Sequence, residues 1–322
     1  MFFDQSAKIY VAGHRGLAGS AICRELNKQG YQNVITKTHQ ELNLEDQDKT
    51  EEFVCDIKPD VVFLAAAKVG GIYANNNYPV DFLMNNLAIQ ANVIKASHKA
   101  NVSRLIFLGS SCIYPKHCTQ PIKEEYLLTS ELEPTNRPYA IAKIAGIEMC
   151  WAYNRQFKTN YLAAMPTNLY GPNDNYDLEN SHVLPALIRK IHLATIKNSP
   201  TVEIWGSGKP KREFLYSDDL ANALVYLMNL DENLYNHLSS NQHCPIINIG
   251  SGSDVAINEL ANIIKNIIGF KGDFFYDINK PDGTYKKLLD VSKINSLGWR
   301  FKTSLAFGIK KAYEDYLNNN NF

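Results

Sequence analysis

The sequence lacks the features that would mark a nucleic-acid-binding or membrane protein. Its 322 residues carry 33 Lys and Arg against 33 Asp and Glu, so no net positive charge is available to hold a polyanion. The longest clear apolar run covers residues 61–67, far too few to span a bilayer, and no basic segment followed by an apolar stretch opens the chain. We therefore expect neither a nucleic-acid partner nor a membrane contact.

Cysteine is scarce and irregularly spaced. The six cysteines, at positions 23, 55, 112, 118, 150 and 244, show neither the paired short spacings of a zinc site nor the density of a disulfide scaffold. We expect reduced thiols, a cytoplasmic protein and no bound metal. A hydrophobic content of 45% with 20% charged residues excludes a disordered chain and predicts a globular one with a sizeable core.

Short apolar runs alternate with longer segments of helical periodicity in the first half of the chain. This alternation predicts repeated βαβ units and hence an α/β fold, a Rossmann-like doubly wound parallel sheet. The expected strands cover residues 8–12, 33–36, 61–65, 104–108 and 161–165, and the expected helices cover residues 16–29, 46–57, 79–100 and 139–157.

The rhythm changes after Met165, where turn-forming residues crowd the segment 166–180. We therefore predict an NADP-binding Rossmann-like domain at 1–170 and a smaller, mainly substrate-binding C-terminal α/β domain at 171–322. A strand at 213–216, a helix opening at Ser217 and a strand at 246–249 are expected to return the chain to the first domain at about 213–250.

A glycine-rich loop follows the first expected strand directly. Glycines there let the backbone turn sharply and approach a pyrophosphate, while the start of the next helix attracts its negative charge. An ordinary glycine-rich turn is the alternative, but the strand before and the helix after favour a dinucleotide site. The cofactor residues predicted here are Gly13, His14, Arg15, Gly16, Leu17, Ala18 and Gly19.

The cofactor is expected to be NADP(H). NAD sites usually place a carboxylate at the end of the second strand, about 20 residues on, to bind the ribose 2′-hydroxyl. The chain has Thr36-Lys37-Thr38-His39 there, and Arg15 adds a cation from the glycine loop. These side chains suit a 2′-phosphate, although either residue of the strand end, Lys37 or His39, could equally be solvated.

Tyr139 and Lys143 are four residues apart at an expected helix start, so their side chains share one face. A nearby ammonium stabilises a phenolate, and we expect Lys143 to bring the pKa of Tyr139 closer to neutrality for proton transfer. Ser110 and Ser111 follow the fourth strand, where a ligand of a parallel sheet binds. A capping role for these serines is the alternative.

Taken together, the glycine loop, the serine after the fourth strand and Tyr-x-x-x-Lys resemble the extended short-chain dehydrogenases/reductases. Longer strings within residues 65–72, 109–115, 134–143, 165–172 and 280–284 resemble the GDP-L-fucose synthase family, and the likeness covers residues 8 to 315. The resemblance implies a homodimeric enzyme that inverts carbons 3 and 5 of GDP-4-keto-6-deoxy-D-mannose and then reduces its 4-keto group with NADPH.

The same resemblance implies roles for individual residues. Ser110, Tyr139 and Lys143 match the reductase triad, and Cys112 and His182 match the acid/base pair of epimerisation. Cofactor contacts are implied at Leu108, Gly109, Ser110, Ser111, Lys143, Pro166, Thr167, Asn168, Leu169 and His182, beside His39, and substrate contacts at Lys190, Trp205, Arg212 and Asp282. The chain has His39 and Lys190 where relatives can carry arginine.

The chemistry of these residues agrees with such a reaction. A 4-keto group acidifies the hydrogens on both flanking carbons, and the ordinary pKa values of cysteine and histidine bracket neutrality. Tyr139 and Ser110 would donate hydrogen bonds to the enolate. A buried inert thiol and a loop histidine are the alternatives for Cys112 and His182.

Two other functions compete with this one. A nucleotide-sugar 4-epimerase that keeps its NAD is disfavoured by the Cys112–His182 pair and by the missing acid after the second strand. A non-catalytic NADP-binding regulator is disfavoured by the presence of Ser110, Tyr139 and Lys143. The expected helices at 79–100 and 139–157 are the surfaces on which two copies could pair.

Overall fold

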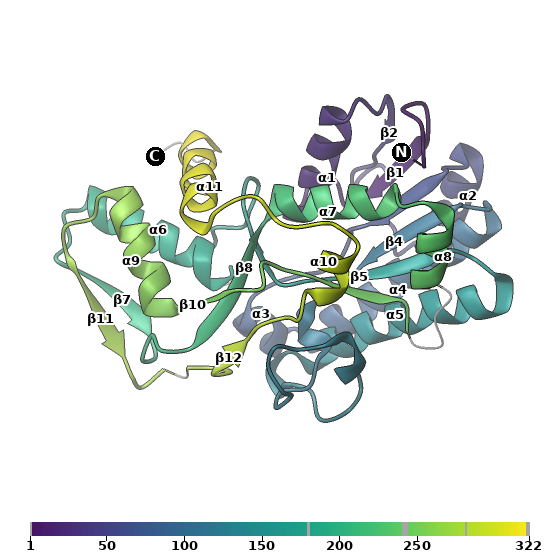
Figure 1. The fold of residues 1–322 in the computed structure, drawn as a ribbon. Coiled ribbons are helices and arrows are strands. Elements are labelled where there is room, and N and C mark those ends of the chain that lie inside the picture. The colour runs from purple at the N-terminus through teal and green to yellow at the C-terminus, as the bar shows by residue number, and fades with distance from the viewer. Residues whose placement is uncertain (1, 179–180, 240–243, 281, 320–322) are drawn as a thin grey trace.

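The computed structural model describes residues 2–178, 181–239, 244–280 and 282–319. A larger lobe is built on a central sheet with helices on both faces, and a smaller lobe holds α6, α9 and α11 (Figure 1). Three buried apolar clusters correspond to this arrangement, one on each face of the central sheet and one in the smaller lobe.

The central sheet is parallel and confirms the predicted fold class. Its order is β2-β1-β3-β4-β5-β9, so the chain adds β2 on one side of β1 and β3 on the other. A crevice opens at the carboxyl ends of strands where the order reverses in this way. The strands are β1 Lys8–Ala12, β2 Asn33–Ile35, β3 Val61–Leu64, β4 Arg104–Leu108, β5 Tyr161–Pro166 and β9 Ile246–Ile249.

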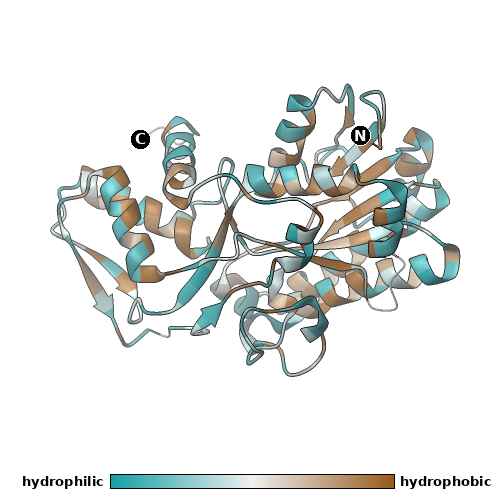
Figure 2. Ribbon diagram, in the orientation of Figure 1, coloured by the Kyte–Doolittle hydropathy of each residue, from teal (hydrophilic) through white to brown (hydrophobic). Residues whose placement is uncertain are grey.

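Helices cover the sheet because their apolar stripes need burial. On one face lie α1 Leu17–Lys28, α7 Ser217–Met228, α8 Glu232–Ser239 and α10 Ser292–Ser296. On the other lie α2 Gln47–Ile57, α4 Pro79–Lys99 and α5 Arg137–Phe157. In Figure 2 the central strands are mostly brown and the covering helices mix brown and teal residues, the pattern of amphipathic helices in a layered domain.

The smaller lobe has its own strands and helices. Its strands are β6 Asn168–Tyr170, β7 Thr201–Trp205, β8 Lys211–Tyr216, β10 Asp254–Ala256, β11 Asp273–Asp277 and β12 Lys286–Lys287. Its helices are α6 Val183–Ile196, α9 Ile257–Ile268 and α11 Leu305–Asn319. Strand β8 pairs with β6, β10 and β12.

The segment expected to return the chain to the first domain at about 213–250 contacts both lobes. Helix α7 packs on the central sheet and β9 extends it, but β8, expected to return with them, pairs outside it. Its neighbours β6, β10 and β12 are distant in sequence, so local periodicity carries no information on this pairing. The exact domain boundaries stay a prediction.

The remaining short elements connect the main ones. They are α3 Ile72–Asn77, η1 Ser111–Ile113, η2 Glu124–Tyr126 and η3 Pro134–Asn136. In the four described ranges, no helix combines the length and apolar character that crossing a membrane requires.

Candidate active site

The glycine loop joins β1 to α1 at the switch point of the sheet. Gly13 has φ +87°, a left-handed conformation that favours glycine, and a Cβ there would lie 2.6 Å from the main-chain nitrogen of Ala66. A Cβ at Gly19 would collide with the carbonyl oxygen of Gly13. Gly16, the N-cap of α1, has room for a small side chain. Close backbone approach therefore explains two of the three glycines.

The start of α1 is open to an anion. In the described part of the chain no side chain caps this helix, and its first turn carries no acidic residue. Its free N–H groups and the positive end of its dipole therefore point at the crevice. Among the predicted cofactor residues, Arg15 is exposed, and His14, Leu17 and Ala18 are half-buried.

The cationic side chains near the end of β2 differ in whether they are already paired with an acidic group. Lys37 lies 3.6 Å from the Glu41 carboxylate and 5.9 Å from the centre of the Phe53 ring, so its charge is already partnered. His39 is exposed. Arg15 and His39 are thus exposed at this corner, whereas Lys37, with a side chain 37% exposed, is paired with Glu41.

Tyr139 and Lys143 lie in the first turns of α5, which begins two residues earlier than expected, at Arg137. The Tyr139 hydroxyl lies near the side chain of Ser110. Lys143 Nζ donates to the carbonyl oxygen of Leu108 over 2.8 Å and lies 5.8 Å from the centre of the Tyr139 ring. The end of β4 and one face of α5 therefore bring the three predicted triad residues together.

Burial, rather than Lys143, dominates the titration of Tyr139. Desolvation raises the pKa of Tyr139 well above its ordinary value, with the nearby Cys112 adding to the rise and the Ser110 side chain opposing it. The expectation that Lys143 brings the pKa of Tyr139 toward neutrality was wrong for this structure. Burial also lowers the pKa of Lys143, to about 8. The sequence shows the spacing of these groups but not how far each is buried, Lys143 fully and Tyr139 partly.

Cys112 and His182 come from the two lobes. Cys112 lies in η1, is buried, and its main-chain N–H donates to Ser110 Oγ over 3.3 Å. His182 is the N-cap of α6 and is exposed. Burial raises the pKa of Cys112, while desolvation and then the charge of Lys287 lower the pKa of His182. The two pKa values therefore do not keep the ordinary positions assumed from sequence.

The predicted substrate residues cluster around Trp205 at the end of β7. Trp205 is 57% exposed, and the ammonium groups of Lys190 and Lys280 each lie 5.3 Å from the centre of its ring. Asp282 accepts hydrogen bonds from the main-chain nitrogen and the hydroxyl of Ser207, over 2.6 and 2.8 Å. Its carboxylate therefore ties the loop after β11 to the turn after β7.

Another group of contacts connects the predicted cofactor segment with the strand that bears Arg212. Thr167 Oγ1 and Asn168 Nδ2 donate to the Glu213 carbonyl oxygen over 3.2 and 2.8 Å, and the Thr167 N–H donates to Ile249. Leu108, Gly109, Ser111 and Pro166 are buried, and Leu169 is half-buried. Arg212 is half-buried, with its pKa lowered by desolvation. β8 thus borders both predicted sites.

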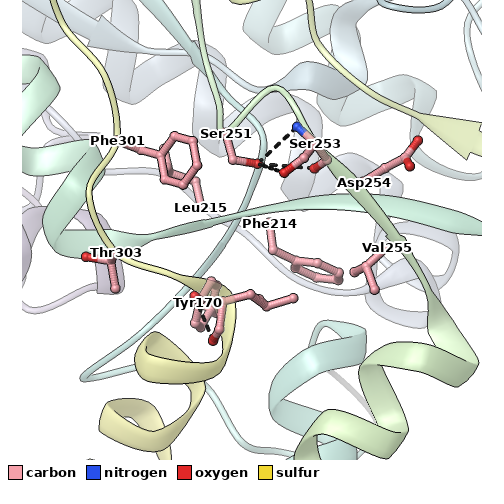
Figure 3. A pocket seen from close by; sticks show the side chains of 10 residues that line it. Tyr170, Phe214, Leu215, Ser251, Ser253, Asp254, Val255, Phe301 and Thr303 are labelled. Carbon is pink, nitrogen blue, oxygen red and sulfur yellow. Dashed lines mark hydrogen bonds between the residues drawn. The ribbon is translucent and has the colours of Figure 1, made fainter.

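Two cavities lie beside these groups. One of about 490 Å³ is lined by Arg15, the loop 173–177, Arg189 and the end of α11, a size suited to part of a nucleotide. The other, of about 130 Å³, lies between β8, β10 and the segment before α11 (Figure 3). It contains none of the predicted site residues and is too small for a nucleotide sugar.

Sequence reasoning missed Lys280 and Lys287. Lys280 stands in the string 280–284 but was not singled out, and only the fold places it over Trp205. Lys287 interacts electrostatically with Cys112, His182 and Arg212, which lie in three other segments. A lysine pair at 286–287 in a polar stretch gives no signal in sequence, because its partners are distant along the chain.

The comparisons with known proteins agree with this geometry. Residues 9–250 match the NAD dependent epimerase/dehydratase family. The chain is 55% identical over 316 residues to putative GDP-L-fucose synthase 2 of Arabidopsis thaliana, covering 98% of this chain and 93% of the relative. It is 50% identical over 315 residues to GDP-L-fucose synthase of Escherichia coli, covering 97% of each.

Solved structures show the same fold. A GDP-6-OMe-4-keto-L-xylo-heptose reductase from C. jejuni has a TM-score of 0.91 at 39% identity, covering 99% of this chain and 100% of the other. A GDP-L-fucose synthetase from Naegleria fowleri bound to NADP has a TM-score of 0.89 at 29% identity, covering 99% and 95%. The chain therefore belongs to the NAD dependent epimerase/dehydratase family and, within it, to the GDP-L-fucose synthases.

Proposed function

We propose that this protein converts GDP-4-keto-6-deoxy-D-mannose into GDP-L-fucose by inverting carbons 3 and 5 and then reducing the 4-keto group with NADPH. The observation that carries the proposal is the meeting of Ser110, Cys112, Tyr139 and Lys143 at the end of β4. Cys112 suits removal of a proton from a carbon beside a ketone. Tyr139 and Ser110 suit protonation of the ketone oxygen. Relatives at 50% and 55% identity carry the name of this activity.

The residues at the crevice fit NADPH. The tight Gly13–Gly19 approach and the open start of α1 suit a pyrophosphate, and the exposed Arg15 and His39 suit a 2′-phosphate. His14, Leu17 and Ala18 would complete this end, while Leu108–Ser111, Lys143, Pro166–Leu169 and His182 would border the reactive end. Bound NADPH supplies the hydride for reduction of the keto carbon.

Tyr139 acts in reduction as the acid that protonates the 4-oxygen. Ser110, whose side chain lies beside the Tyr139 hydroxyl, would donate to the same substrate oxygen. The Lys143 ammonium, held by the Leu108 carbonyl 5.8 Å from the centre of the Tyr139 ring, lies on the same helix face as the phenol.

Cys112 and His182 act in epimerisation. The Cys112 thiolate removes the proton from a carbon beside the ketone, and the electron pair moves onto the 4-oxygen as an enolate. His182, from the other lobe, returns a proton to the opposite face.

The nucleotide end of the substrate binds around Trp205. The exposed indole face suits stacking on a guanine, and the charges of Lys190 and Arg212 suit the diphosphate. Asp282 holds the turn after Trp205 in place through Ser207. A base stacked on Trp205 would compete with Lys190 and Lys280 for the ring faces.

The test is to mix purified protein with GDP-4-keto-6-deoxy-D-mannose and NADPH in deuterated water. We expect nicotinamide absorbance to fall, deuterium at carbons 3 and 5, and GDP-L-fucose as product. Absorbance loss with unexchanged carbons would identify a reductase without epimerase activity. An interconverted sugar without net NADPH oxidation would identify a 4-epimerase, and unchanged substrate would favour a regulator.

We also propose that the enzyme is a homodimer that pairs through α4 and α5. The first turns of these adjacent helices present the exposed apolar residues Val80, Met84 and Ile141. Large exposed apolar side chains that gather on neighbouring helices commonly mark an interface. Sedimentation of the protein should give twice the chain mass of 36.3 kDa, and Met84→Glu should shift it toward the monomer.

A cytoplasmic location is the remaining proposal. All six cysteines are free thiols, which suits a reducing compartment. Fractionation of cells that make the protein should place it with cytoplasmic markers, and recovery with secreted proteins would contradict this.

A further inference from the structure

Strand β7 presents Glu203 and Trp205 on one face. Val202 and Ile204, which alternate with them, are buried in the core of the smaller lobe. Successive side chains of a strand point to opposite faces, so Glu203 and Trp205 lie together on the outer face. Strand β11 pairs in parallel with β7 from Thr201 to Trp205. The backbone that carries Glu203 and Trp205 is therefore held by both the core and the neighbouring strand.

The Glu203 carboxylate contacts the indole of Trp205. Trp205 Nε1 donates a hydrogen bond to Glu203 Oε1 over 2.7 Å. A hydrogen bond to a charged group is stronger than one between neutral groups, and this one engages the only polar atom of the indole. Trp205 is largely exposed, so packing limits the rotation of its ring less than it would in a core. The carboxylate therefore sets the orientation of the ring.

Glu203 also lies beside Lys190, another predicted substrate residue. Lys190 Nζ donates to the main-chain oxygen of Glu203 over 3.5 Å and lies 5.3 Å from the centre of the Trp205 ring. Burial lowers the pKa of Lys190, and the charge of Glu203 opposes this decrease. Glu203 is therefore joined to two predicted substrate residues through separate atoms, to Trp205 by its carboxylate and to Lys190 by its carbonyl.

The charge of Glu203 and its hydrogen bond have opposite effects on the proposed substrate. The diphosphate of a GDP-sugar is negatively charged, so a carboxylate nearby weakens its binding through charge alone. The hydrogen bond strengthens binding, because an indole that is already oriented loses less conformational freedom when a base stacks on it. Since these two effects differ in sign, substitutions that remove one or both of them can separate them.

We propose that Glu203 is a positioning residue of the nucleotide end of the site, whose carboxylate orients the Trp205 indole for stacking with the guanine base. This inference rests on the proposed function, in which Trp205 binds that base. Glu203 acts through Trp205 and not on the sugar. Its substitution should therefore change the affinity for the substrate and leave the proton and hydride transfers unchanged.

The test measures GDP binding by titration calorimetry, with the cofactor site saturated with NADP. Glu203→Ala removes both the acceptor and the charge, whereas Glu203→Gln keeps an acceptor oxygen and removes only the charge. A net hydrogen bond corresponds to about three- to tenfold in an equilibrium constant. We expect Glu203→Ala to raise the Kd by that factor and Glu203→Gln to bind GDP at least as tightly as the parent. Glu52→Ala, on the exposed surface of α2, removes the same charge and should match the parent.

Three further readouts separate positioning from a structural role. In turnover assays, Glu203→Ala should raise KM for the GDP-sugar and leave kcat unchanged. The indole N–H signal of Trp205 in NMR spectra, identified by its loss in Trp205→Phe, should shift in Glu203→Ala and stay near the parent position in Glu203→Gln. Trp205→Phe removes the donor and keeps an aromatic ring, so adding Glu203→Ala to it should cause no further loss of GDP affinity.

An unchanged Kd in Glu203→Ala, an equal loss of affinity in Glu203→Gln, or the same loss in the Trp205→Phe background would overturn the inference. A wrong assignment of the nucleotide end gives a different result, because Trp205→Ala would then bind GDP like the parent. Weaker binding in Trp205→Ala together with parent-like binding in Glu203→Ala would overturn the role of Glu203 alone.

Discussion

Lys143 Nζ donates a hydrogen bond to the main-chain oxygen of Leu108, joining α5 to the last residue of β4 over 2.8 Å. This contact fixes the helix face that bears Tyr139 against the loop that begins with Gly109 and Ser110. Because Lys143 is 3% exposed and its pKa is lowered to about 8, its charge is sensitive to pH in the alkaline range.

Replacing Tyr139 with phenylalanine should separate chemistry from binding. Tyr139→Phe removes the proton donor for the 4-oxygen, and we expect reduction to slow by roughly a hundredfold or more, the usual size for an acid–base group. NADPH affinity, measured by fluorescence titration, should stay within a factor of about three, since the phenyl ring keeps its place beside Phe82. Reduction at the parent rate would show that Tyr139 has another role.

Arg15 should set the preference for NADPH over NADH. A charge-assisted phosphate contact contributes about 1.5–3 kcal/mol, so we expect at least about a tenfold preference in kcat/KM. Arg15→Ala should reduce this preference through a higher KM for NADPH. Lys37→Ala is the matched control, because Lys37 is already paired with Glu41. Equal efficiency of the parent enzyme with both cofactors would contradict the assignment.

Substitution of Cys112 or His182 should impair epimerisation while leaving reduction in place. Cys112→Ser is expected to abolish deuterium exchange at carbons 3 and 5, because a hydroxyl has a far higher pKa than a thiol and is a poor base. Slow NADPH oxidation should remain and give a 6-deoxyhexose other than fucose. His182→Asn should retain some proton removal and slow its return. Parent-like exchange by the Cys112 variant would mean that the thiol is structural.

Asp174 should make stability depend on pH. Burial raises its pKa from 3.8 to about 7, and in the described part of the chain its Oδ2 has no hydrogen-bond partner. Ionisation is therefore easier in the unfolded chain, and the folded state loses stability as pH rises from about 4 to 7. Asp174→Asn cannot ionise.

The expected gain of Asp174→Asn is at least about 1 kcal/mol at pH 8, below a ceiling of roughly 4 kcal/mol set by the pKa difference. At pH 4 the variant and the parent should unfold at nearly the same denaturant concentration. Urea titrations at both pH values measure this, and a gain of equal size at pH 4 would point to packing rather than charge.

Much of the larger lobe follows from local sequence. Residues 8–12 and 104–108 form strands at the predicted limits, because buried parallel strands leave a short apolar run bounded by turn formers. The clustering of Ser110, Tyr139 and Lys143 follows from helix spacing and from the meeting of strand ends at one edge of the sheet. Local patterns were sufficient for both.

Other features depend on contacts that no local pattern encodes. The pairing of β8 with β6, β10 and β12, the position of Lys287 and the raised pKa of Tyr139 all require the folded arrangement. Desolvation in particular is set by atoms from several segments, so an ordinary solution pKa was the wrong starting point for Tyr139 and Cys112.

Helix α7 and strand β9 belong to the larger lobe although they follow residue 170 in the chain. This limits where the chain can be cut into fragments that fold. A fragment that ended at residue 170 would lack the helix that covers α1 and the strand that pairs with β5. Buried side chains such as Ile22 and Leu162 would then face water, and β5 would present an unpaired edge to other chains. Expression of the nucleotide-binding half alone should therefore give aggregates, whereas a single cut in the loop before α6 should leave both pieces associated.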